Sequence, residues 1–280
     1  DGGGIYLYGF DGGLQIQRTT VSGNTAGDDG GGAVLYSDDL PPGIGGSVEA
    51  STISGNTAGG VGGGIELLGL SGPLTISDST IAGNSTEAYG GGVWNYGQWD
   101  APVTIRNSTI ARNTAAEHGG GIAREAFDSP SFPGDDDLDL SSTIVASNTA
   151  PAGPDISNPP TPLNPISGTV SVGFSLIGNT AGGVTITESP AGSNLLNTDP
   201  QLGPLADNGG PTQTILPALS SPVVDAGVAN GLATDQRGLP RTVATTFTPP
   251  PGAGGTDMGA VEIQDDAIEG DKVKAKESQR

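Results

Sequence analysis

The densest group of residues that could bind a metal ion is the acidic stretch PGDDDLDLS, residues 133–141. Asp135, Asp136, Asp137 and Asp139 could each offer carboxylate oxygens to Ca²⁺, which takes about six to eight oxygen ligands. Their spacing does not match that of a calcium-binding loop, so a solvated acidic loop is the simpler interpretation. Calcium at these aspartates is the one cofactor that the sequence leaves open, and we predict no other metal or cofactor.

Catalytic chemistry finds little support in the residue types. His118, in AEHGGG, is the single histidine, and a solvated turn position explains it without a Ser-His-Asp arrangement. No lysine precedes residue 272, and the arginines do not stand beside repeated carboxylates, as a polysaccharide-cleaving site would require. These arginines are Arg18, Arg106, Arg112, Arg124, Arg237 and Arg241. We therefore predict no catalytic residue.

Charge and composition exclude several classes of protein. The 280-residue chain carries a formal net charge of −21, which would repel nucleic acid. Its three lysines, Lys272, Lys274 and Lys276, lie in the last ten residues, whereas residues 1–270 hold 29 acidic residues against six arginines. Cysteine is absent, so neither disulfides nor thiolate metal sites are expected. No apolar run is long enough for a membrane-spanning helix and no targeting segment is recognisable, so we expect no direct membrane insertion.

A seven-residue phrase recurs along the chain every 28 to 35 residues. It reads TTVSGNT at 19–25, STISGNT at 51–57, STIAGNS at 79–85 and STIARNT at 108–114, with looser copies at 142–149 and 174–180. Glycine triplets begin successive units at residues 2, 30, 62, 90 and 119. Self-similarity at this period is typical of a repeat architecture.

Each unit has the pattern of one turn of a β-solenoid. Apolar residues alternate, as in Leu74-Thr75-Ile76, and turn-forming residues are frequent, while helical periodicity is almost absent. Equivalent residues of successive turns would stack about 4.8 Å apart. We predict an all-β chain that forms a single right-handed parallel β-helix, or β-solenoid, with a β-rich capping region at the C-terminal end.

Stacking gives the repeated residues structural roles. Ile53, Ile81 and Ile110 are expected to form an interior column. One asparagine from each phrase is expected to join a ladder of hydrogen-bonded carboxamides at a corner, because asparagine tolerates left-handed backbone. The expected ladder is Asn24, Asn56, Asn84, Asn113, Asn148 and Asn179. The glycine triplets suit a corner where a Cβ atom does not fit.

Aromatic residues form the first candidate interface. Tyr8, Tyr36 and Tyr96 share the fourth position after a triplet, and alternation predicts that they face outward. Tyr6 and Trp94 lie two positions earlier and are expected on the same face. Such a column could stack on sugar rings or pack against another protein; alternatively, the rings only cover the sheet.

The lysine-bearing tail is the second candidate interface. A solenoid must protect its terminal strands, because an open edge invites pairing. Lys272, Lys274 and Lys276 could place the C-terminal region of one copy over the first turn, Gly2 to Gly9, of another. Such a head-to-tail contact would produce filaments, whereas simple cut ends of a longer surface protein would not.

The repeats over about residues 2–183 resemble those of right-handed parallel β-helix surface proteins of the polymorphic outer membrane protein type. The segments NLLNTDPQLGPLADNGGPTQTILPALSSPVVDAG (194–227), TDQRGLPR (234–241) and DMGAVE (257–262) resemble the choice-of-anchor Q domain. The resemblance implies a bacterial surface or secreted protein with repeats at 1–183, a closing region at 184–264 and a charged tail at 265–280. In the closing region we expect structural ion pairs among Asp225, Asp235, Arg237, Arg241, Asp257 and Glu262.

These features together predict a non-enzymatic extracellular or cell-surface protein with a structural or adhesive role. The expected partners are further copies of the chain, and surface glycans or the surface of a host or neighbouring cell. The alternative is a polysaccharide-binding or polysaccharide-cleaving β-helix. The ligand, the mode of anchoring and the oligomeric state are not specified by the sequence.

Overall fold

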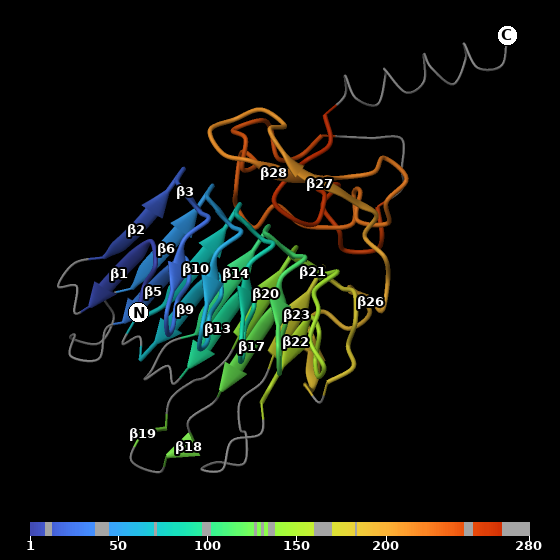
Figure 1. Cartoon of the computed structure of the whole chain (residues 1–280). Helices are drawn as coiled ribbons and strands as arrows, with labels where there is room; N and C mark the ends of the chain where they lie inside the picture. The colour runs from blue at the N-terminus through green and yellow to red at the C-terminus, as the bar shows by residue number, and fades with distance from the viewer. Residues whose placement is uncertain are drawn as a thin grey trace, which may run out of the picture.

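The fold is an all-β solenoid of about five turns, as the repeats predict (Figure 1). No helix occurs among the described residues, and hence none that is long and apolar enough to cross a membrane. The computed structural model describes residues 1–8, 13–36, 45–69, 72–96, 102–125, 128–129, 132–133, 138–159, 170–182, 184–243 and 249–264.

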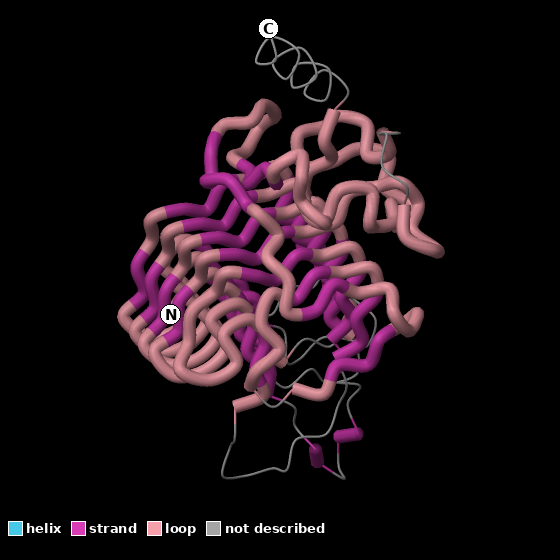
Figure 2. Tube along the Cα trace, turned by 90° about the vertical axis from the view of Figure 1, so that its right-hand side faces the viewer, coloured by secondary structure: helices cyan, strands magenta, loops and turns pink. Residues whose placement is uncertain are grey.

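Successive turns add parallel strands to four sheets, and the turns lie side by side along the stack (Figure 2). The first sheet contains β1 (Ile5–Tyr8), β5 (Ala33–Tyr36), β9 (Ile65–Leu68), β13 (Val93–Tyr96), β17 (Ile122–Glu125) and β22 (Ile156–Ser157). The second contains β2 (Leu14–Gln17), β6 (Gly46–Glu49), β10 (Leu74–Ser77), β14 (Val103–Arg106), β20 (Leu138–Ser141), β23 (Val170–Gly173) and β25 (Ile186–Glu188).

Two shorter-stranded sheets and two antiparallel pairs complete the described strands. The third sheet contains β3 (Thr20–Ser22), β7 (Thr52–Ser54), β11 (Thr80–Ala82), β15 (Thr109–Ala111), β21 (Ile144–Ala146), β24 (Leu176–Ile177) and β26 (Leu195–Leu196). The fourth contains β4 (Thr25–Ala26), β8 (Thr57–Ala58), β12 (Ser85–Thr86) and β16 (Thr114–Ala115). The antiparallel pairs are β18 (Asp128–Ser129) with β19 (Phe132–Pro133), and β27 (Leu202–Ala206) with β28 (Thr214–Pro217).

Inward-facing apolar side chains fill the solenoid. In β10, Leu74 and Ile76 are buried, whereas Thr75 between them is half-buried. The predicted interior column is confirmed, because Ile81 is in register with Ile53 on one side and Ile110 on the other. Burying a side chain of this size contributes about 1.5–3 kcal/mol, so repeated columns stabilise the stack.

A ladder of asparagine carboxamides runs beside these columns. The Nδ2 atom of each member donates to Oδ1 of the next, at 2.9 Å from Asn24 to Asn56, 2.9 Å from Asn56 to Asn84, 2.9 Å from Asn84 to Asn113 and 3.0 Å from Asn113 to Asn148. The same Oδ1 atoms also accept the backbone N–H of the preceding member. The buried carboxamides thus bond to the turns on both sides.

The backbone at the ladder differs from our expectation. The asparagines are not in the left-handed region; the residue just before each one is, with φ of 63° at Gly55, 66° at Gly83 and 58° at Arg112. Glycine precedes three of the five members because it enters this region without steric cost. The asparagine itself is then free to turn its side chain inward.

Asn179 does not belong to the ladder, and Asp155 takes the place that we assigned to it. Asp155 Oδ1 accepts from Asn148 Nδ2 at 2.8 Å, and its Oδ2 accepts from the backbone N–H of Asn179 at 2.6 Å. Every ladder bond points toward later turns, so the last asparagine needs only an acceptor, which a carboxylate supplies. Burial raises the pKa of Asp155 to about 6, although its hydrogen bonds with Asn148 and Asn179 oppose the shift.

The glycine triplets form the tight corner that their composition predicts. The first glycine of a triplet has positive φ, for example 65° at Gly62. The second has no space for a side chain: a Cβ atom on Gly63 would lie 2.4 Å from the carbonyl oxygen of Ser85. These corners return the chain to the first sheet at the start of each turn.

The C-terminal region, described over residues 198–243 and 249–264, packs along the outer face of the third sheet rather than across the last turn (Figure 1). Three threonines at the second position of the repeated phrase, Thr52, Thr80 and Thr109, contact it. Thr80 Oγ1 donates to Gln236 Oε1 at 2.6 Å, and Thr109 Oγ1 accepts from the backbone N–H of Ala260 at 3.1 Å. Apolar contacts join Ile144 and Leu176 of the solenoid to Val223, Ala226 and Met258.

Candidate functional site

The outer surface of the first sheet carries the predicted aromatic column. Tyr8, Tyr36, Leu68 and Tyr96 are successive partners in the sheet register. Tyr8 is 57% exposed, whereas the other three are half-buried. The rings of Tyr8 and Tyr36 lie 4.9 Å apart. This column therefore places one well-exposed ring and its neighbour on the flank of the first two turns.

Trp94 does not lie on an exposed surface, contrary to our expectation for its column. It is 4% exposed, and the ring of Tyr89 packs 5.5 Å from it. The corner before each triplet folds back over this column: a Cβ atom on Gly90 would lie 2.8 Å from the Cα of Trp94. Among the described residues in register with Trp94, Tyr6 in the first turn is the exposed one, with 49% exposure. The exposed aromatic surface is thus narrower than alternation predicts, and we call Tyr6, Tyr8 and Tyr36 the tyrosine patch.

His118 lies in the corner column, at the position where other turns have Asp29, Val61 and Tyr89. It is half-buried, and its ring lies 5.5 Å from that of Tyr89. The turn position is as predicted, but the side chain packs against an aromatic ring instead of extending into solvent.

Glu66 is an acidic residue in the otherwise buried part of the Trp94 column. Its side chain is covered, with 5% exposure, between Val34 and Trp94 in the sheet register. Burial, and then the nearby Asp29 and Asp28 carboxylates, raise the pKa of Glu66 to about 7. A carboxyl group that is partly protonated near neutral pH can both donate and accept a proton.

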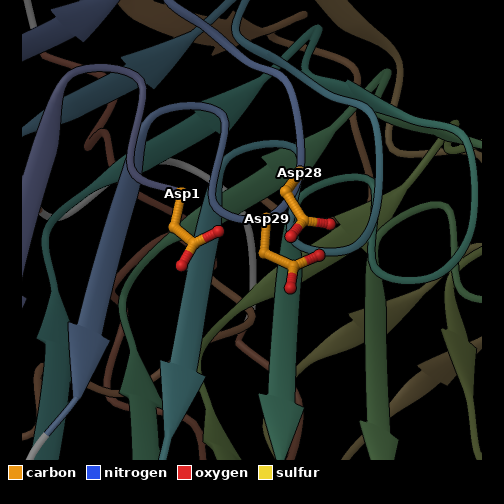
Figure 3. Close-up of side chains that lie close together, drawn as sticks. All are labelled: Asp1, Asp28 and Asp29. Carbon is orange, nitrogen blue, oxygen red and sulfur yellow. The ribbon is translucent and has the colours of Figure 1, made fainter.

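Three more carboxylates gather near Glu66, at the corners before the first and second glycine triplets. The side chains of Asp1, Asp28 and Asp29 point toward one another (Figure 3), and their ligand oxygens all lie within 4.8 Å of each other. Asp29 Oδ1 also accepts the backbone N–H of Val61 at 2.7 Å, which fixes its orientation. This group, which we call the aspartate cluster, is the one set of potential metal ligands found among the described residues.

The other predicted interaction residues do not join this surface. Asp139 is half-buried on β20 of the second sheet, between Thr104 and Ser171 in the register. Asp135, Asp136 and Asp137 lie outside the described residues, as do Lys272, Lys274 and Lys276.

Charged residues of the C-terminal region have structural contacts. Arg237 pairs with Asp235 at 2.7 Å, and Arg241 pairs with Asp78 of the solenoid. Asp257 accepts backbone N–H groups of Asp225 and Ile263, while Glu262 accepts those of Val243 and Asp257. Burial is the main cause that raises the pKa of Asp257 to about 6 and that of Glu262 to about 8. Two of these acids are therefore held mainly by backbone donors and not by the arginines that we expected.

Sequence reasoning missed Glu66 and the aspartate cluster. The available signal was that Glu66, in GGGIELLG, places an acid where other triplets are followed by Tyr6, Val34 or Trp94. Asp28 and Asp29 form a pair in the corner before the second triplet, but only the stacking of turns shows that Asp1 lies beside them.

Comparison with known proteins gives no match to a family model, a curated protein or a solved structure. The resemblance to polymorphic outer membrane protein repeats and to the choice-of-anchor Q domain thus has no support from these comparisons, and the parallel β-solenoid is the identity that is established.

The raised pKa of Glu66 predicts an unusual pH dependence of stability. The unfolded carboxyl has a pKa of 4.5 and the folded one about 7, so between these values the folded state binds more protons. Stability from this group is present below pH 4.5 and is lost as the pH rises toward 7 and above. We expect the Glu66→Gln variant to lose less stability than the native protein between pH 5 and 8, by up to about 3 kcal/mol.

Urea unfolding at the two pH values measures this difference. Glu117→Gln, which changes an exposed acid at the corner two turns further along the stack, is the control and should follow the native pH dependence. Identical pH dependence of the native protein and Glu66→Gln would contradict the prediction.

Proposed function

We propose that this β-solenoid is a non-enzymatic extracellular or cell-surface protein that adheres to glycans through the tyrosine patch. The observation that carries the proposal is that Tyr6 and Tyr8 are 49% and 57% exposed on one sheet face, with the Tyr36 ring 4.9 Å from Tyr8. Exposed rings in a row offer apolar faces for sugar rings and hydroxyl groups for polar contacts.

Carboxylates near the patch support a sugar ligand. Asp1, Asp28 and Asp29 lie beside the first two turns and can accept hydrogen bonds from sugar hydroxyl groups. These carboxylates, together with the net charge of −21 of the whole chain, would repel an acidic polysaccharide. A neutral or amino-bearing glycan therefore fits this surface best. The bacterial surface origin implied by the resemblance of the repeats is consistent with such a role.

Self-association is a further part of the proposed adhesive role. Among the described strands of this chain, β1, β2 and β3 each pair on one side only, and an edge of this kind is suited to pairing with a strand of another copy. The lysines at positions 272, 274 and 276 are the basic counterpart to the acidic body of a neighbouring copy. Head-to-tail addition of copies would multiply the tyrosine patch along a filament.

Binding of the native protein to immobilised neutral, amino-bearing and acidic polysaccharides tests the proposal. We expect the Tyr8→Ser/Tyr36→Ser variant to lose at least about tenfold in retention, because both stacking rings are removed. Leu239→Ser, which removes an exposed apolar side chain of the C-terminal region, is the matched control and should bind as the native protein does.

Unchanged retention of the double variant would rule out the tyrosine patch as the binding surface. Release of reducing ends during the same incubations would instead support the polysaccharide-cleaving alternative. Light scattering and negative-stain microscopy of the same samples read the assembly state: fibres support head-to-tail addition, and discrete rods at all concentrations count against it.

A further inference from the structure

We propose that the aspartate cluster, Asp1, Asp28 and Asp29, binds one divalent cation with hard oxygen preference, best fitted by Ca²⁺. This inference does not depend on glycan binding. The site is distinct from the acidic stretch at 133–141 and joins residues from the first turn and the corner that leads to the second.

The dimensions of the cluster suit a single ion. Two ligands on opposite sides of Ca²⁺, each about 2.4 Å from it, are about 4.8 Å apart. One carboxylate oxygen from each aspartate lies within 4.8 Å of those from the other two, which is the spacing of oxygens that share one such ion. Carboxylates that bind in bidentate mode, together with water, can complete the coordination that Ca²⁺ requires.

A fourth carboxyl group, that of Glu66, adds negative charge next to the cluster, where the N-terminal ammonium group of Asp1 is the cation that lowers its pKa. Glu66 is 5% exposed and makes no hydrogen bond or ion pair with any other residue in the described part of the chain. Its Cβ lies directly below the corner of the third turn, since a Cβ atom on Gly62 would be 2.9 Å away, and Asp29 Oδ1 is bonded to the same corner through the Val61 N–H. A carboxyl that is buried without a partner is costly unless a cation or a proton compensates it.

The corner before the third glycine triplet leaves space for the aspartate side chains of the turn before it. Gly60 has no side chain, and a Cβ atom there would lie 2.1 Å from Asp29 Oδ1 and 3.1 Å from Asp28 Oδ1. The carboxylates therefore occupy the volume that a larger residue at position 60 would fill. The described salt bridges join Arg237 to Asp235 and Arg241 to Asp78, so no arginine in the described ranges neutralises the cluster.

Bound calcium would connect the first two turns. The backbone N–H of Gly2 donates to the carbonyl oxygen of Asp29 at 2.9 Å, so Asp1 already lies next to the second corner. An ion shared by Asp1, Asp28 and Asp29 would replace repulsion between their charges with three ionic contacts. We therefore expect calcium to raise the unfolding temperature of the protein.

Calorimetric titration of the chain with calcium chloride, after treatment with a chelator, tests the site. We expect one ion per chain, with affinity at least tenfold lower in the Asp28→Asn/Asp29→Asn variant. Asparagine keeps the oxygen that accepts the Val61 N–H, so this variant should still fold, as circular dichroism without calcium would verify. Asp199→Asn/Asp207→Asn, with the same change of charge at exposed residues of the C-terminal region, is the matched control.

Three results would overturn the site. The first is no saturable heat of binding up to about 10 mM calcium, which exceeds the range of weak extracellular calcium modules. The second is equal affinity in the Asp28→Asn/Asp29→Asn variant and in the control. The third is a calcium-induced rise in unfolding temperature that survives in the double variant. Loss of glycan binding by the tyrosine variant leaves all three readouts unaffected, so the two proposals fail separately.

Discussion

Replacing Asn84 with alanine is expected to destabilise the protein by about 4 kcal/mol, because it opens the centre of the asparagine ladder. Asn84 Oδ1 accepts from both the backbone N–H and the Nδ2 of Asn56, at 3.0 and 2.9 Å. Its own Nδ2 donates to the carbonyl of Ile53 and to Oδ1 of Asn113. Without Asn84, two buried donors of Asn56 lose their acceptor, and each costs about 1–3 kcal/mol.

The first ladder residue provides the control for this experiment. Asn24 is half-buried, and its removal leaves its backbone N–H still bonded to Asn56 Oδ1. We expect Asn24→Ala to cost no more than about 1 kcal/mol. Asn179→Ala, outside the ladder, should have a similarly small effect. Urea unfolding measures all three variants, and equal losses for Asn84→Ala and Asn24→Ala would show that the ladder does not stabilise the interior.

The Arg241→Met variant is expected to detach the C-terminal region from the solenoid, at a cost of about 3–5 kcal/mol. Arg241 is fully buried; it donates to the carbonyls of Gly259 and Ala260 and pairs with the Asp78 carboxylate. Methionine fills similar space but leaves the Asp78 charge buried without its partner.

The pH dependence of this variant follows from Asp78. Burial raises the pKa of Asp78 to about 6, and Arg241 opposes the shift. Removing Arg241 therefore raises the pKa further. Because a raised carboxyl pKa means that the folded state holds its proton longer, stability is retained at low pH and lost as the pH increases. We expect Arg241→Met to be more damaging at pH 8 than at pH 5.

A double-mutant cycle separates the ion pair from simple packing. Asp78→Asn removes the charge, and asparagine tolerates the positive φ of 45° at this corner. The Asp78→Asn/Arg241→Met variant should therefore regain much of the stability lost in either single variant. Limited proteolysis at pH 8 would locate the damage: cleavage confined to residues 198–264 supports detachment, whereas uniform cleavage along the repeats would contradict it.

The repeated features of the fold could be predicted because they depend on local pattern and on translation from one turn to the next. Once Leu74-Thr75-Ile76 alternates and the phrase STISGNT recurs, like residues must stack, which places Ile81 between Ile53 and Ile110. The glycine corners follow from the same translation, since a Cβ on Gly63 would collide with the neighbouring turn. Composition and period thus determined the class of fold and most of the ladder.

Contacts that occur once could not be predicted in this way. Asp155 ends the ladder from a different part of its turn, so the position of Asn179 in the repeated phrase was misleading. Trp94 has the alternation of an exposed residue, yet Tyr89 covers it from a corner five residues earlier. Thr80 and Thr109 have the pattern of ordinary strand residues, but they contact Gln236 and Ala260 from a distant segment.

The sequence by itself therefore determined that this protein is a stacked β-solenoid, because periodic residues interact mainly with their own copies one turn away. Only the tertiary structure decided that Asp1, Asp28 and Asp29 meet beside the buried Glu66, and that the C-terminal region covers the third sheet. The physical reason is that these groups have no equivalent in the other turns. Their contacts depend on how the corners and the C-terminal region pack, and a repeat pattern carries no information about either.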